Sequence, residues 1–212
     1  MFITLEGLDG SGKTTQVKLL ADRLSRENQN VLVLREPGGT EVGEKIRTIL
    51  LDKRIEGMTS VSEFLLFSAS RSQLVEEVIK PALEGGTAVV CDRFYDSSTA
   101  YQGWGRQIPL EAVEVINRCA TGGLVPDLTF FIDLPVADVE KRINRLRGKD
   151  RMESVGREFY DRVRDGYLAI ATRENRFHVI DGKQDIDTIH ESVWEHVELM
   201  LVQSEKRKET KI

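Results

Sequence analysis

The sequence predicts an α/β fold in which a five-stranded parallel sheet carries helices on both faces. Three observations lead to this prediction. Five short apolar runs alternate with longer segments of helical periodicity, and the first run leads directly into a glycine-rich loop and a helix. The run at 87–91 is apolar without alternation, which is typical of a strand buried on both faces. The expected strands are residues 2–5, 31–34, 87–91, 128–132 and 177–180.

Composition indicates one globular domain. The chain has 212 residues, 40% of them hydrophobic, and we expect a single domain over 1–204 with a charged tail at 205–212. A net charge of −5 argues against a protein that coats nucleic acid. Cys91 and Cys119 have neither metal-ligand spacing nor a disulfide pattern. The absence of a signal peptide and of a long apolar run predicts a cytoplasmic protein without membrane contact.

A phosphate-binding loop follows the first strand. Residues 7–14, GLDGSGKT, match G-x-x-x-x-G-K-[ST] in full, in the required order of strand, loop and helix. The alternative is a chance match in a glycine-rich turn. We expect Lys13 to reach the β- and γ-phosphates of ATP and Thr14 to hold Mg²⁺. The residues expected around ATP are Gly7, Leu8, Asp9, Gly10, Ser11, Gly12, Lys13, Thr14 and Thr15.

The remaining elements are predicted from helical periodicity and from turn residues. Thr40 is a candidate N-cap for a helix that extends to residue 50. Ser60 or Thr59 is a candidate N-cap for a long helix at 60–82. A polar stretch at 96–106 precedes a helix opened by Pro109. Further helices are expected at 110–120, 136–146, 157–175 and 186–203. The carboxyl ends of parallel strands meet at one edge of a sheet, so the loop at 7–14, residues 35–39, Asp92, Arg93, Asp133 and Asp181 are expected to share one cleft.

The motifs favour an enzyme that moves a phosphoryl group to a small acceptor. The Asn-Lys-x-Asp motif of GTPases and the Leu-Ser-Gly-Gly-Gln motif of transporters are absent, and there is no long second domain for a motor. Such a reaction needs charge neutralisation and in-line positioning. Asp92, at the end of a buried strand, is placed to hold Mg²⁺ directly or through water; the alternative is a helix cap or an ion pair.

Arginines indicate the acceptor side. Arg35, Arg47, Arg71, Arg93 and Arg106 are candidates for binding phosphate, and Arg93 is the best of them because it follows Asp92. Phe67 and Arg71 lie one helical turn apart, which suits stacking on a base while its edge is hydrogen-bonded. The alternative is a core phenylalanine beside a surface arginine. The segment RGKDR at 147–151 is either a closing lid that excludes water or an ordinary charged loop.

Together these motifs resemble bacterial thymidylate kinases. The resemblance runs from Phe2 to about Val197 and covers EGLDGSGKTT, REPGGTEVGEKIR, FSASR, DRFYDSSTAYQG, PDLTFFIDLP and RGKDR. DRFYDSSTAYQG and REPGGT are the most specific segments, because other small kinases share only the phosphate loop. The resemblance implies a nucleoside monophosphate kinase fold with a lid near 145–156, and transfer of phosphate from Mg-ATP to dTMP.

The resemblance also implies roles for individual residues. Asp9 contacts the deoxyribose 3′-hydroxyl, and Arg47 and Arg93 hold the acceptor phosphate. Phe67 stacks on thymine while Arg71 bonds its O4 edge. The other residues implied at the dTMP site are Pro37 near the sugar and base, Ser98 and Gln102 near the base edge, and Tyr101 against the sugar.

Residues 8–11 of the loop include no basic side chain, so the sequence resembles the members that carry the transition-state arginine in the lid. Arg151 is the first candidate and Arg147 the second. Arg142 and residues 181–184 resemble contacts on the adenine side, and the family implies a homodimer. Two other hypotheses stay open: a kinase for a different nucleoside monophosphate, and a nucleotide-sensing module without turnover.

Overall fold

The computed structural model describes residues 1–143 and 156–209 and contains the predicted sheet. Five parallel strands lie in the order β2-β3-β1-β4-β5. Each strand ends one residue later than predicted, because the strand pairing includes the polar residue that follows each apolar run. Their bounds are β1 Phe2–Glu6, β2 Val31–Arg35, β3 Ala88–Asp92, β4 Leu128–Asp133 and β5 Phe177–Asp181.

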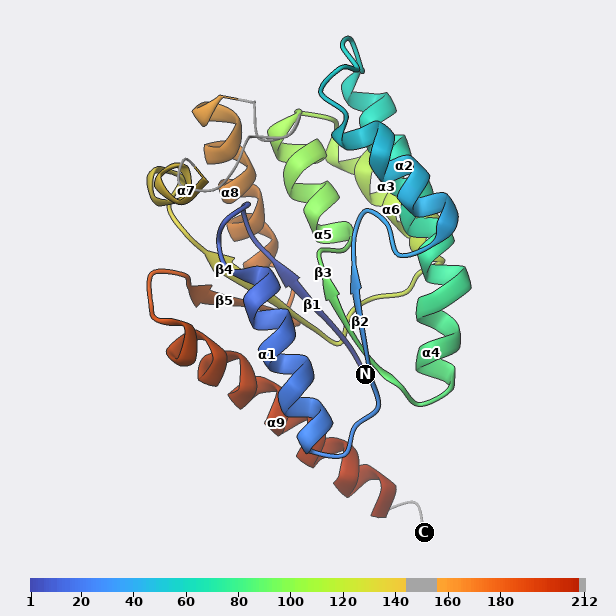
Figure 1. Ribbon diagram of the computed structural model, residues 1–212, viewed down its shortest axis with the longest axis vertical. Helices are drawn as coiled ribbons and strands as arrows, with labels where there is room; N and C mark the ends of the chain where they lie inside the picture. Colours follow the sequence, from blue (N-terminus) through green and yellow to red (C-terminus); the bar gives the residue numbers. More distant parts are fainter. Residues whose placement is uncertain (144–155, 210–212) are drawn as a thin grey trace.

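Helices cover both faces of the sheet (Figure 1). One face carries α1 (Lys13–Arg26) and α9 (Ile186–Glu209), and the other carries α3 (Ser60–Leu74), α8 (Arg157–Ala171) and the short α5 (Tyr95–Ser98). α2 (Glu41–Leu51) packs against α3 rather than on the sheet. Among the described residues, none of the helices has the length and apolar character needed to span a bilayer.

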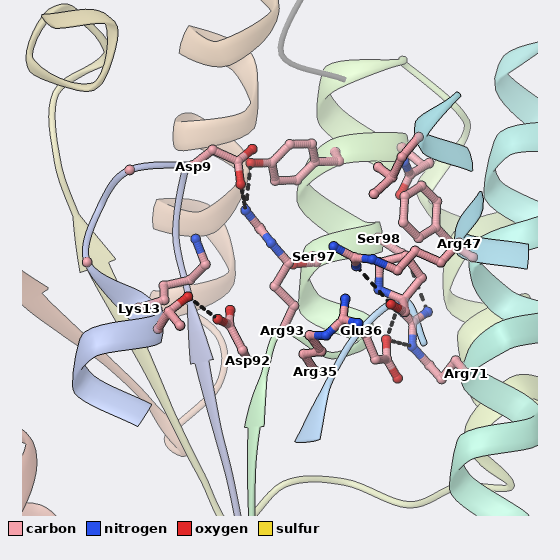
Figure 2. A pocket seen from close by; sticks show the side chains of 18 of the residues that line it. Asp9, Lys13, Arg35, Glu36, Arg47, Arg71, Asp92, Arg93, Ser97 and Ser98 are labelled. Atoms are coloured by element: carbon pink, nitrogen blue, oxygen red, sulfur yellow. Dashed lines mark hydrogen bonds and ion pairs between the residues drawn. The ribbon is translucent and has the colours of Figure 1, made fainter. Parts of the chain in front are cut away.

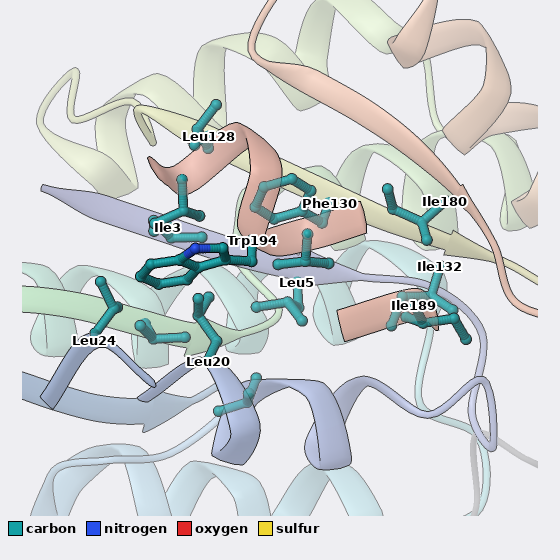
Figure 3. Close-up of a cluster of buried hydrophobic side chains, with 14 residues drawn as sticks. Ile3, Leu5, Leu20, Leu24, Leu128, Phe130, Ile132, Ile180, Ile189 and Trp194 are labelled. Atoms are coloured by element: carbon teal, nitrogen blue, oxygen red, sulfur yellow. The ribbon is translucent and has the colours of Figure 1, made fainter. Parts of the chain in front are cut away.

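Alternation along the central strands divides the core between the two faces. Ile3 and Leu5 point to the same face, where they join Phe130 and Ile132 of β4. Phe131, which lies between these two residues of β4, packs on the opposite side. Figure 3 shows the first cluster, in which Leu20 and Leu24 of α1 and Trp194 of α9 close over the sheet.

Several helices begin at the predicted residues. The Thr40 side chain accepts a hydrogen bond from the Gly43 amide at 2.9 Å, and the Thr59 side chain accepts one from the Ser62 amide at 3.2 Å. The caps of α2 and α3 are therefore side-chain oxygens that satisfy free amides of the first turn. α6 (Leu110–Thr121) follows Pro109 and ends at Gly122, which has φ +58°.

The structure corrects the sequence prediction in several places. The long helix expected at 60–82 includes a π-helical turn, η1 (Val75–Ile79), before α4 (Lys80–Glu84). The polar stretch at 96–106 is helical over α5 and the π-helix η2 (Thr99–Gly105), because it is packed against α6 and α8. The helix predicted to reach residue 175 ends at Ala171, and α9 continues through Glu209 into the predicted tail. α7 (Val136–Ile143) is described up to Ile143.

Candidate active site

A pocket of about 560 Å³ opens at the carboxyl ends of β1, β2 and β3 (Figure 2). The phosphate loop lines one part of it, and residues of α2, α3, α5 and η2 line the rest. The predicted cleft is therefore present, but Asp133 and Asp181, which were expected in it, do not line the pocket, and Asp133 pairs with Arg164 at 2.6 Å instead. The sequence-predicted residues that line it are Asp9, Gly10, Gly12, Lys13, Thr14, Thr15, Arg35, Pro37, Arg47, Phe67, Arg71, Asp92, Arg93, Ser98, Tyr101 and Gln102.

The phosphate loop needs glycine at two positions. Gly7 has φ +145°, and a Cβ there would lie 2.8 Å from the Ile132 carbonyl oxygen. Gly12 caps α1 with φ +106°, a conformation that side chains disfavour. The Ser11 hydroxyl is buried and makes no hydrogen bond to the described part of the chain. This tight turn at a helix N-terminus, with an unpartnered hydroxyl, fits an anion such as a nucleotide phosphate.

Lys13 is held over its own loop. Its side chain is 6% exposed, and Nζ donates a hydrogen bond to the Leu8 carbonyl at 2.9 Å. Burial, with a smaller contribution from Arg93, lowers the pKa of Lys13 to about 8, although Asp9, Asp92 and Glu6 oppose the shift. A bound phosphate would supply the missing negative charge, so the buried ammonium is suited to the donor nucleotide.

Thr14 and Asp92 both line the pocket and contact each other. The Thr14 hydroxyl donates to Asp92 Oδ2 at 2.7 Å. Within the described residues, no group of three or more His, Cys, Asp or Glu forms a complete metal cage. One carboxylate and one hydroxyl fit Mg²⁺, which usually takes few protein ligands and completes its shell with water and phosphate oxygens.

Arg93 lies between the loop and the far half of the pocket. Its Nη2 atom is 2.8 Å from Asp9 Oδ1 and 3.3 Å from the Tyr101 hydroxyl. Burial disfavours the Asp9 carboxylate, but Arg93 and Lys13 outweigh burial and hold the pKa of Asp9 below its ordinary value. An ionised Asp9 and a fixed guanidinium therefore face the same space.

Glu6 supports the turn that carries Arg93. Arg93 has φ +75°, a conformation rare for a residue with a side chain. The Glu6 carboxylate accepts hydrogen bonds from the Phe94 amide at 2.7 Å, Ser97 Oγ at 2.6 Å and the Tyr167 hydroxyl at 2.8 Å. Burial, with a smaller effect from the nearby Asp96, raises the pKa of Glu6 to about 7.

The acceptor side includes a fully buried ion pair. Arg71 is 1% exposed, and its Nε and Nη2 atoms lie 2.8 Å and 2.7 Å from Glu36 Oε2. Nη1 donates to Ser98 Oγ at 3.1 Å and to Asn117 Oδ1 at 3.3 Å, and Nη2 also reaches the Phe94 carbonyl at 3.2 Å. The guanidinium thus donates four hydrogen bonds and makes a second ion-pair contact with Glu36. The alternative of a surface arginine beside Phe67 is wrong.

The other candidate arginines differ in their surroundings. Arg47 lines the pocket and donates to the Pro37 carbonyl at 2.9 Å. Arg35 also lines the pocket but pairs with Glu44 at 3.2 Å. Arg106 does not line the pocket, and it pairs with Glu63 at 3.0 Å. Of the predicted phosphate-binding arginines, Arg106 is therefore the one that the fold directs elsewhere.

The structure describes Arg142, which the resemblance places on the adenine side. Arg142 donates to the Gly10 carbonyl at 3.3 Å and to the Gly182 carbonyl at 3.2 Å, so it joins the loop to the segment after β5. It does not line the pocket, and neither do Gly7, Leu8 or Ser11 of the loop. The predicted lid arginines Arg147 and Arg151 lie outside the described residues.

The sequence analysis missed several residues that line the pocket or hold Arg93 in position. Glu36, Leu51 and Ser97 line the pocket, and Glu6 and Tyr167 lie directly behind Arg93. Glu6 carried a signal, since it is a charged residue at the end of an apolar strand. Tyr167 carried none, because a tyrosine on an amphipathic helix is usually part of the core.

Comparisons with known proteins agree with this geometry. The family model described as thymidylate kinase matches residues 5–193. The chain is 50% identical over 200 residues to the thymidylate kinase of Caldanaerobacter subterraneus subsp. tengcongensis, covering 93% of this chain and 94% of that protein. It is 48% identical over 201 residues to the thymidylate kinase of Thermosipho melanesiensis, covering 95% and 99% of the two chains.

A solved structure extends the likeness to the fold. The crystal structure of thymidylate kinase from Ehrlichia chaffeensis superposes with a TM-score of 0.76 at 40% sequence identity, over 93% of this chain and 98% of that one. Both the sequence match and the structural match therefore span nearly the whole domain. The chain belongs to the thymidylate kinase family.

Proposed function

We propose that the chain transfers the γ-phosphoryl group of ATP to dTMP and so supplies dTDP for dTTP synthesis. One observation carries this proposal. The phosphate loop and the Phe67–Arg71 face of α3 line a single pocket, and Arg93 lies between them. A donor phosphate at Lys13 and an acceptor phosphate at Arg93 would face each other there, which is the arrangement that in-line transfer requires.

On the donor side, we assign Lys13 and the loop amides to the ATP phosphates. Thr14 and Asp92 would hold Mg²⁺, which neutralises phosphate charge when bound. Arg142, between the loop and Gly182, is assigned to the adenine side. Replacing Asp92 with Asn should reduce the affinity for Mg²⁺ in a titration followed by tryptophan fluorescence, in the presence of a non-hydrolysable ATP analogue.

On the acceptor side, Arg47 and Arg93 would hold the dTMP phosphate. Phe67 would stack on the base, Arg71 would bond its O4 atom, and Ser98 and Gln102 would face its edge. Because the Arg71 guanidinium already contacts four protein acceptors, the base must share one of its N–H donors or replace one contact.

On the sugar side, Asp9 would accept the 3′-hydroxyl, Tyr101 would occupy the space of a ribose 2′-hydroxyl, and Pro37 would line the remaining wall. All three residues line the pocket. A Tyr101→Ala variant should therefore phosphorylate dUMP and UMP at more similar rates than the parent protein does. Unchanged discrimination between these two acceptors would contradict the assignment.

The resemblance assigns transition-state stabilisation to the lid near 145–156. Arg151→Ala should reduce kcat by about 10³-fold, and Arg147→Ala should reduce it by less. The KM for dTMP should change little in both variants, because the contact forms as charge develops. A larger loss in Arg147→Ala would exchange the two roles.

The decisive experiment is an ADP-release assay with Mg-ATP and a panel of acceptors: dTMP, dUMP, UMP, dCMP, dGMP and AMP. We expect strong turnover with dTMP, weaker turnover with dUMP and little with the others. Equal turnover across the panel would remove the base and sugar assignments. No turnover with any acceptor would favour a nucleotide-sensing module.

We also propose a homodimer in the cytoplasm. The proposal of a dimer is supported by α3, which exposes Val61 at 53% and Leu65 at 50% on a face away from the sheet. A Leu65→Arg variant should sediment as a monomer while the parent sediments as a dimer. Fractionation of the source cells would test the location.

A further inference from the structure

The Gln102 side chain has a fixed orientation at the pocket wall. Gln102 is 2% exposed and lines the pocket. Its Nε2 atom donates a hydrogen bond to Glu63 Oε1 at 3.0 Å. An amide presents donors on one side and an acceptor on the other. If the amide nitrogen of Gln102 faces Glu63, the amide oxygen remains as a hydrogen-bond acceptor for a ligand in the pocket.

Glu63 permits one orientation of this amide. Glu63 is 1% exposed, and Arg106 pairs with both of its oxygens, Nε with Oε1 at 3.2 Å and Nη2 with Oε2 at 3.0 Å. A carboxylate held by a guanidinium in this way is ionised and only accepts hydrogen bonds. The reversed amide would bring Gln102 Oε1 against a carboxylate oxygen, with two buried acceptors facing each other.

The acceptor of Gln102 is consequently left for a ligand. Among the residues that the structure describes, no hydrogen bond is donated to Gln102 Oε1, and the residue lines the pocket. A pocket that presents a fixed acceptor selects a ligand with a donor at that point. Thymine and uracil carry a donor at N3–H, whereas N3 of cytosine is an acceptor.

We propose that Glu63 is a specificity-determining positioning residue, which orients Gln102 so that the pocket accepts the N3–H of thymine and rejects cytosine. The inference rests on the proposed function, since it places the base beside Gln102. Glu63 touches no substrate itself and acts through the amide. Arg106, which the sequence suggested as a phosphate ligand, donates to both Glu63 oxygens and so holds this carboxylate as an acceptor.

The test compares kcat/KM for dTMP, dUMP and dCMP in the parent and in Glu63→Gln. A glutamine at 63 can donate as well as accept, so the Gln102 amide is free to reverse. We expect the ratio of kcat/KM for dTMP to that for dCMP to fall by about tenfold or more. The ratio for dTMP to dUMP should stay unchanged, because both bases carry N3–H. A purely structural role would lower all three values together and leave both ratios intact.

Further variants keep the test decisive. Glu63→Asp retains an acceptor-only partner and should keep the dTMP to dCMP ratio within about threefold of the parent. If Glu63→Gln folds poorly because Arg106 loses its partner, the neutral pair Glu63→Gln with Arg106→Gln should fold and still lose discrimination. In a Gln102→Leu background, Glu63→Gln should have no further effect on the ratio.

The controls separate the inference from the proposed function. Glu41→Gln changes an exposed carboxylate that pairs with Lys45 and should leave both ratios at parent values. A parent protein that does not prefer dTMP would overturn the proposed function. A parent that prefers dTMP, with an unchanged dTMP to dCMP ratio in Glu63→Gln and in the neutral pair, would overturn only the role of Glu63.

Discussion

Asp9 and Arg93 form an ion pair of 2.8 Å that joins the phosphate loop to the turn after β3. The two residues follow strands that are neighbours in the sheet, since β1 pairs with β3. Arg93 is also bonded to the hydroxyls of Ser97, Tyr101 and Tyr167. The guanidinium is thus fixed before any substrate binds, which would reduce the entropic cost of ordering it in the role that we propose at the acceptor phosphate.

Arg93→Lys should lower kcat/KM for dTMP by about 10²-fold. A lysine keeps the charge, but one ammonium cannot retain the contacts to Asp9 and to the surrounding hydroxyls while it also holds a phosphate. Steady-state kinetics at saturating ATP measure the change. Arg54→Lys, at an exposed pair with Asp52, is the matched control. Activity of Arg93→Lys within about threefold of the parent would argue against its contact with the acceptor phosphate.

Lys13→Met should lower kcat by about 10²- to 10³-fold, because the buried ammonium contacts the loop that we propose binds the donor phosphates. Methionine keeps much of the apolar volume, so the fold should survive. Lys45→Met, which removes an exposed ammonium paired with Glu41, should behave as the parent in the same assay. Undiminished turnover in Lys13→Met would show that the donor site lies elsewhere.

Glu36→Ala should destabilise the protein by about 3–5 kcal/mol, because it leaves the buried Arg71 guanidinium without its carboxylate. Both side chains are almost fully buried, at 3% and 1% exposure. Urea unfolding at neutral pH measures the loss. Glu41→Ala breaks an exposed pair and should leave the unfolding midpoint where it is. A similar midpoint for the two variants would mean that solvent reaches Arg71.

The stability of the parent should fall between about pH 4.5 and pH 7 relative to Glu6→Gln. The pKa of Glu6 is raised from 4.5 to about 7 by burial, so the folded protein holds a proton in this window that the unfolded chain has released. Rising pH therefore favours unfolding, by up to about 3 kcal/mol across the window. Urea unfolding of both proteins at several pH values isolates this residue, and parallel pH profiles would contradict the shift.

Local patterns in the sequence predicted the fold and most of the pocket. The phosphate loop is a contiguous motif, and the five strands are short apolar runs, so neighbouring residues contain the needed information. The rule that ligands bind at the carboxyl ends of parallel strands then placed Asp92 and Arg93 beside Lys13. The structure brings these residues to the same pocket.

What the sequence did not predict depends on contacts between distant residues. Glu36 and Arg71 are 35 residues apart, and Glu6 and Tyr167 are 161 apart. The spacing of apolar residues along the sequence does not indicate that a charged side chain will be buried beside an oppositely charged partner. The helical state of residues 95–105 was missed for a related reason. A side chain at position 105 would collide with Phe159 and Val163 of α8, so this segment packs closely on that helix. Tertiary packing of this kind overrides the local propensity of the sequence.

The π-helical turn η2 holds Tyr101 and Gln102 in a segment that carries one residue more than an α-helix of the same length would. A π-helical turn takes up its extra residue within one wider turn, so the helical residues on either side keep the directions that an α-helix would give them. Deleting that residue should therefore leave the flanking packing in place and change only where the side chains inside the turn point, Tyr101 and Gln102 among them. A loss of one codon would thus reshape the pocket wall locally while the rest of the fold stays as it is.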